Sequence, residues 1–137
     1  LVPAELLDVT LVGQPRRAAS PRTFVEVEVA LDTPHESAHQ RVADLQRHGA
    51  WPETGRLRHI GSAAALGTLL AELAGTVDGV RLHPLVLDED LAVLSRLVVP
   101  ALLRTGLVTR PVAGQTLRTA LGLERPANRF AAAGETR

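Results

Sequence analysis

The sequence has no cysteine and no methionine, and only one tryptophan and two phenylalanines among its 137 residues. Without cysteine the chain can form no disulfide, no thiolate metal site and no cysteine nucleophile, so we expect a cytoplasmic protein. Because aromatic residues make up 2% of the chain, the core must consist of leucine, valine and alanine. The lack of methionine, with Leu1 in first place, predicts that these residues belong to a longer polypeptide.

The chain also has no net charge, because 15 basic residues balance 15 acidic ones. This balance argues against a nucleic-acid partner and against binding to a membrane surface. No run approaches the ~18 apolar residues of a membrane span, and no basic segment followed by an apolar stretch opens the chain. We therefore expect neither a nucleic acid nor a membrane as a partner.

Four segments have the pattern of strands, and four have the pattern of helices. The expected strands are residues 6–12, 23–31, 57–60 and 78–84. The expected helices are residues 34–48, capped by Asp32 or Thr33, then 62–74, 88–105 and 116–121. Pro100 lies inside the third helix and removes one backbone hydrogen bond, so a kink is expected near Arg96.

The alternation of strands and helices predicts parallel pairing with right-handed crossovers, and therefore an α/β fold. We expect residues 1–110 to form about four strands and three helices, and residues 111–137 to form a C-terminal extension whose last residues, 131–137, are disordered.

Local motifs that carry chemistry are absent: the sequence has no P-loop, no G-x-G-x-x-G, no H-E-x-x-H and no G-x-S-x-G. Arg81 and His83 alternate with apolar residues on the last expected strand. They are either catalytic side chains at the carboxyl end of that strand or structural residues that form hydrogen bonds with Asp78, Asp88 or Asp90. Gly61 and Ser62 follow a strand and open a helix, which suits either a phosphate site or an ordinary helix cap.

Other polar residues favour structural roles. His35 and His39 are four apart on an expected helix and lack a third ligand, so we expect a solvated helix face and no metal. Glu26 and Glu28 share one face of a strand, which suits an exposed face better than a general acid and base. The acidic residues 88–90 begin a helix, where its dipole favours them.

The segment from Val77 onward resembles the C-terminal end of luciferase-like, flavin-dependent monooxygenases. The features that carry this resemblance are Asp78-Gly79-Val80, Val98-Val99-Pro100, Thr105-Gly106 and the tail at residues 116–129. Upstream, Thr33-Pro34 with Ala38 and Arg41, and Ile60-Gly61-Ser62, are similar to further segments of that family, although Ala63 replaces a proline.

The resemblance covers roughly residues 23–130 and implies the C-terminal half of a TIM-barrel fold. For a complete protein it implies that reduced FMN and dioxygen oxidise a small organic substrate, with a flavin reductase as an indirect partner. A complete barrel has ~250 residues, so we expect this chain alone to be inactive and to need the missing barrel half or a second copy. One alternative is a non-catalytic assembly or binding subunit that completes its barrel by dimerisation or with a partner chain. The other is an unrelated small α/β module whose ligand lies at the strand ends near Gly13 and His83.

Overall fold

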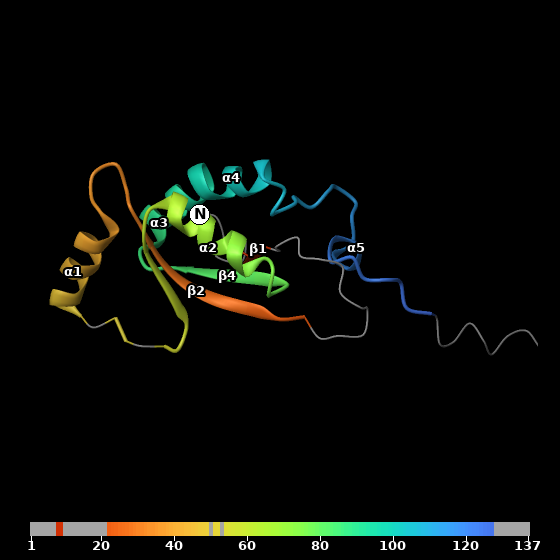
Figure 1. Ribbon diagram of the computed structural model, residues 1–137, viewed down its shortest axis with the longest axis horizontal. Coiled ribbons are helices and arrows are strands. Elements are labelled where there is room, and N and C mark those ends of the chain that lie inside the picture. Colours follow the sequence, from red (N-terminus) through yellow and green to blue (C-terminus); the bar gives the residue numbers. More distant parts are fainter. Residues whose placement is uncertain (1–7, 10–21, 50, 53, 128–137) are drawn as a thin grey trace, which may run out of the picture. The chain divides into compact units, whose positions relative to one another are not determined.

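The computed structural model describes residues 8–9, 22–49, 51–52 and 54–127 of the chain. The chain divides into two compact units. One comprises residues 1–15 and 21–110, and the other comprises residues 16–20 and 111–137. The first unit is an α/β fold in which strands and helices alternate (Figure 1). The predicted disorder of residues 131–137 lies outside the described residues.

A four-stranded sheet with the order β1-β4-β2-β3 forms the centre of the first unit. Its strands are β1 (Asp8–Val9), β2 (Phe24–Leu31), β3 (Leu57–Gly61) and β4 (Gly79–Pro84). β2 pairs in parallel with both β3 and β4, which confirms the predicted parallel units. The prediction was wrong for the described part of the first strand: β1 runs antiparallel to β4, as edge strands of otherwise parallel sheets often do.

The order of the parallel strands differs from the order that a barrel requires. A barrel places consecutive strands side by side, whereas β4 lies beside β2, with β3 on the other side of β2. The connections from β2 to β3 and from β3 to β4 therefore cross the sheet in opposite directions. Because such crossovers are right-handed, their helices must lie on opposite faces of the sheet.

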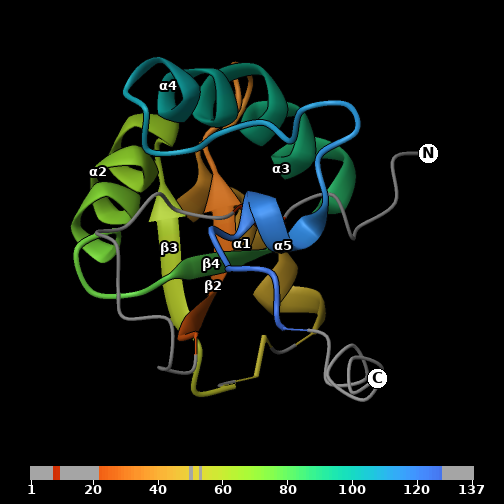
Figure 2. The same cartoon turned by 90° about the vertical axis from the view of Figure 1, so that its right-hand side faces the viewer.

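The helices occupy these two faces as the crossover rule demands (Figures 1 and 2). One face packs against α2 (Ala63–Leu73) and against the segment formed by α3 (Leu87–Val93) and α4 (Val99–Arg104). The core on this face is aliphatic, as predicted, and includes Val27, Val29 and Leu31 of β2. On the opposite face α1 (Ala38–His48) covers a smaller cluster around Ala30 at the carboxyl end of β2.

The first helix begins later than the sequence predicts, at Ala38 rather than Pro34. Both expected caps form other bonds: Asp32 accepts a hydrogen bond from the Ala38 amide, and Thr33 accepts one from the Glu36 amide. Ser37 caps the helix instead and accepts a hydrogen bond from the Gln40 amide. Residues 33–36 thus form a turn at the carboxyl end of β2.

The third predicted helix is interrupted by a change of helix type around Arg96, where the sequence predicts a kink. α3 is followed by a π-helical turn at Leu94–Val98, and α4 then begins with Pro100 in its first turn. Proline has no amide hydrogen to donate to the Arg96 carbonyl four residues earlier, so the regular ladder breaks there.

In the second unit the described residues form one short helix, α5 (Leu117–Ala120). Its cap is Thr116, as predicted, and Gly122 follows with a positive φ of 64°. Among the helices in the described ranges, none is long and apolar enough to cross a membrane.

Candidate functional site

Charged side chains from three strands, and from Arg56 just before β3, meet on the sheet face opposite α2. We call this surface the charged sheet face; it consists of Glu26, Glu28, Arg56, Arg58, Arg81 and His83. The register opposes Glu26 to Arg81, and it opposes Glu28 to both His83 and Arg58. α1 covers only the carboxyl end of this side of the sheet, around Ala30.

Glu28 is the buried acid of the charged sheet face, with a relative exposure of 5%. Burial acts to raise the pKa of its carboxyl group, but hydrogen bonds from Thr54 Oγ1 and Arg58 Nε, both 2.7 Å long, outweigh burial and lower the pKa. The carboxylate is therefore held in its charged form. The prediction of an exposed strand face is wrong for Glu28 because Thr54 and Arg58 cover it.

Glu26 is the more exposed acid and joins three basic side chains. A hydrogen bond from Arg56 Nε is the largest cause that lowers the pKa of Glu26, and charge from Arg56, His83 and Arg81 adds to it. Arg81 Nη1 lies 3.5 Å from its carboxylate and His83 Nε2 lies 3.6 Å away. The two residues predicted to be catalytic thus meet at one carboxylate.

His83 lies near the carboxyl end of β4, as the sequence predicts, with a third of its side chain exposed. Its Nε2 atom is buried and has no hydrogen-bond partner among the residues that the structure describes. The sequence suggested Asp78, Asp88 or Asp90 as the partner of this histidine, but Asp90 pairs with Arg41, and the carboxylate near His83 is that of Glu26. Nε2 of His83 therefore lies beside the Glu26 carboxylate.

Gly61 and Ser62 lie where a phosphate site would need them, at the junction of β3 and α2. Gly61 ends β3 with a φ of 151°, and Ser62 caps α2 by accepting a hydrogen bond from the Ala65 amide. The first amides of a helix have no intrahelical partner and attract anions. The structure does not bring this turn to His83: Gly61 pairs with Leu31, three residues beyond Glu28, and β2 separates the two strands.

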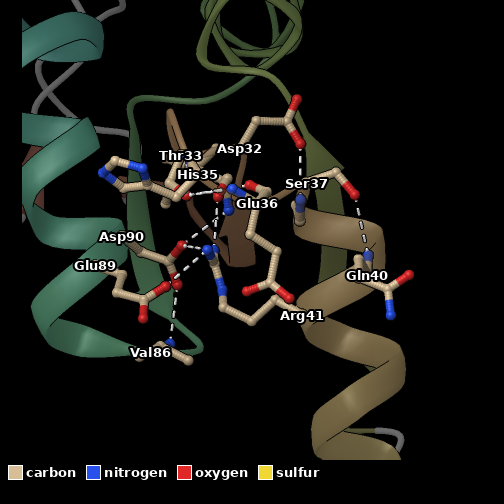
Figure 3. A network of polar contacts seen from close by, with 12 residues as sticks. Asp32, Thr33, His35, Glu36, Ser37, Gln40, Arg41, Val86, Glu89 and Asp90 are labelled. Atoms are coloured by element: carbon tan, nitrogen blue, oxygen red, sulfur yellow. Dashed lines mark hydrogen bonds and ion pairs between the residues drawn. The ribbon is translucent and has the colours of Figure 1, made fainter.

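A buried ion pair joins α1 to α3, and the sequence did not predict it (Figure 3). Arg41 is 5% exposed and donates hydrogen bonds of 2.6 Å to both Asp90 and the Leu31 carbonyl. Asp90 is fully buried and also accepts from the backbone amides of Leu31, at 2.8 Å, and Val86, at 2.9 Å. The pair therefore ties the carboxyl end of β2 to the start of α3.

Glu89 extends this pair towards solvent. Its carboxylate lies 2.8 Å from Arg41 Nη1, and about half of its side chain is exposed. The contact between Arg41 Nη1 and Glu89 is an ion pair without hydrogen-bond geometry. Neither Nη1 nor Nε of Arg41 has a hydrogen-bond partner within the described residues. The sequence predicts a structural role for the acidic residues at the start of this helix, and Asp90 has one. It stabilises the fold through hydrogen bonds with Arg41, Leu31 and Val86 rather than through the helix dipole alone.

Two arginines missed by sequence reasoning hold these sites together. Arg41 lies three residues after Ala38 and next to Val42, and both of these are buried on the same helix. A charged residue within this apolar stripe was the sequence signal that could have indicated a buried arginine. Arg58 binds Glu28 and stacks on Trp51, with 4.3 Å from its guanidinium carbon to the ring centroid. The register between β2 and β3, which the sequence does not specify, brings Arg58 to Glu28.

The two histidines once expected on one helix face are separated. His35 lies in the turn before α1, and only His39 lies within the helix. Within the described ranges, no three histidine, aspartate or glutamate side chains are grouped to hold a metal ion.

Comparison with protein-family models, with curated proteins and with solved structures gave no significant match to this chain. Functional inference therefore rests on the residues and geometry described above.

Proposed function

We propose that this chain supplies C-terminal β/α units of a luciferase-like, FMN-dependent monooxygenase and is inactive without the rest of that protein. The motifs between residues 77 and 129 and the succession of parallel β/α units support the family. The observation that carries the proposal is the charged sheet face. Parallel sheets are covered on both faces, and among the described helices α1 packs on the second face at its carboxyl end.

In the proposed enzyme the polar side of β4 lines the inside of a larger assembly, where His83 and Arg81 contact the reacting molecules. His83 would hold or release a proton at Nε2. Arg81 would place positive charge beside a developing anion. The bound flavin would supply the activation of dioxygen, and the free amides after Gly61 and Ser62 suit its phosphate.

The proposal requires a change in strand pairing. A barrel would place β4 beside β3, so β4 would have to leave β2 when the missing units join. A chain locked in its present pairing should then be unable to take part. Val25 and Val80 are partners across β2 and β4. Because the native chain lacks cysteine, the intended disulfide is the only one that a Val25→Cys/Val80→Cys variant can form within one chain, and non-reducing electrophoresis separates it from disulfides between chains.

The experiment is complementation of a luciferase-like monooxygenase truncated before its last β/α units. With a flavin reductase, FMN and dioxygen, adding this chain should restore substrate oxidation, as the enzyme's own C-terminal segment does in the positive control. The cysteine variant should restore activity when reduced and lose it when oxidised, and His83→Ala should assemble but turn over more slowly. If the enzyme's own segment restores activity and this chain does not, the proposal is wrong.

A second candidate is a non-catalytic subunit that covers its charged sheet face with a second copy of itself. The face carries both Glu26 and Arg81, so two copies related by a twofold axis would oppose acids to bases. Light scattering would detect the dimer, and Arg81→Glu should weaken it. A monomer at all concentrations would remove this candidate.

A further inference from the structure

A largely apolar crevice of about 410 Å³ lies at the carboxyl ends of β2 and β4. One wall is the turn after β2, including Pro34, and the other is the helical segment after β4, including Ala92, Val93 and Leu97. The volume is within the range of small-molecule sites, and ligands of open parallel sheets bind where neighbouring strands send their connections in opposite directions. β2 and β4 are neighbours, and the helices that follow them, α1 and α3, pack on opposite faces of the sheet.

Two carboxylates line this crevice. Glu89 comes from α3, and Arg41 holds one of its oxygens at 2.8 Å while half of the side chain stays exposed. Glu36 comes from the turn after β2, is half-buried, and its carboxylate has no partner among the residues that the structure describes. Figure 3 shows both acids near Arg41, which is itself fixed by Asp90 and the Leu31 carbonyl.

The local charge is negative. Glu36, Glu89 and Asp90 contribute three negative charges and Arg41 and Arg96 two positive charges, which leaves one negative charge when the lining histidine is neutral. Carboxylates beside apolar walls attract a ligand that brings a positive charge and an apolar body.

We propose that this crevice binds a small organic amine, with the ammonium group between Glu36 and Glu89 and the apolar part against Pro34, Val93 and Leu97. Arg41 acts as a positioning residue that orients the Glu89 carboxylate. A ligand carboxylate is the competing occupant; it would pair with Arg96, or with Arg41 after displacing Glu89 from Nη1. This site is separate from the charged sheet face and does not depend on the proposed monooxygenase function.

The test compares n-hexylamine, 1-hexanol and hexanoate, which share an alkyl chain and differ in the head group, by ligand-observed NMR titration of the full chain. Hexylamine should bind most tightly and hexanoate least. Glu89→Gln and Glu36→Gln should each weaken hexylamine binding roughly tenfold, since a hydrogen bond to a charged group is lost. Glu72→Gln, at an exposed acid on α2, is the matched control and should change nothing.

Three results would overturn the proposal. Preferential binding of hexanoate, or tighter binding of hexanoate after Glu89→Gln, would assign the crevice to carboxylates. Equal binding of the three compounds would show that the head group is not recognised. Absence of binding by all three, with circular dichroism showing a folded chain, would show that the crevice is not a site for small amines.

Discussion

Removal of the Asp90 carboxylate should destabilise the fold more than almost any other single change of a polar side chain. Asp90 is fully buried and its two oxygens accept hydrogen bonds from Arg41, Leu31 and Val86. In Asp90→Ala the Arg41 guanidinium stays buried and retains only the half-exposed Glu89 as a charged partner. Two backbone amides also lose their acceptor.

The magnitude follows from these contacts. Breaking a buried ion pair by removing one partner costs about 3–5 kcal/mol, because the remaining charge is uncompensated. For a unit of this size, 1 kcal/mol corresponds to a change of about 4–8 °C in Tm, so Asp90→Ala should lower Tm by roughly 12 °C or more. Glu89→Ala is the matched control, and because Glu89 is half-exposed its loss should cost less than about 1 kcal/mol.

Urea unfolding followed by circular dichroism and by the fluorescence of the single tryptophan measures these free energies. A double-mutant cycle with Arg41→Met and Asp90→Asn should give a double variant that is less destabilised than the sum of the single variants, with a coupling of about 0.5–3 kcal/mol. The reasoning is refuted if Asp90→Ala costs less than 1 kcal/mol or if the two single losses simply add.

Three further predictions concern the strands and the core. Gly79→Ala should cost about 1–3 kcal/mol in urea unfolding, because its Cβ would lie 2.3 Å from the Phe24 ring, and adding Phe24→Ala should recover part of the loss. The lowered pKa of Glu28 means that its contribution to stability is present above its ordinary value of 4.5 and is lost as pH falls below that value; unfolding curves of Glu28→Gln should lack this acid dependence. Leu66→Ala should cost about 2–5 kcal/mol of unfolding free energy and the exposed Leu97→Ala much less, and equal losses would contradict the described core.

The sequence predicted the residues of β2, β3 and β4 because each strand has a local signal, whereas of the predicted strand at residues 6–12 only Asp8–Val9 are described. In β2, apolar and polar residues alternate, and Val27 and Val29 are buried in the core as that alternation requires. The start of α1 was mispredicted because Asp32, Thr33 and Ser37 are all residues that cap helices. The choice among them depends on hydrogen bonds formed in the fold.

The charged sites were harder to predict because they depend on pairing between distant segments. His83 and Arg81 were identified by their place on β4, but their contact with Glu26 depends on the β2–β4 register. Arg41 and Asp90 are 49 residues apart, and each alone reads as an ordinary polar residue of a helix. No periodicity within one segment specifies either contact.

The strand order accounts for both the buried ion pair and the crevice. Because β4 lies directly beside β2, the turn after β2 faces the helix that follows β4, and Arg41 can reach Asp90. If β4 lay beside β3 as in a barrel, β3 and its following turn would separate these segments, and the pair could not form with the present geometry. The Arg41–Asp90 contact is therefore diagnostic of the described strand order. Assembly into a barrel would have to break it, so Asp90→Ala, which destabilises the isolated chain, should not impair the same chain in complementation.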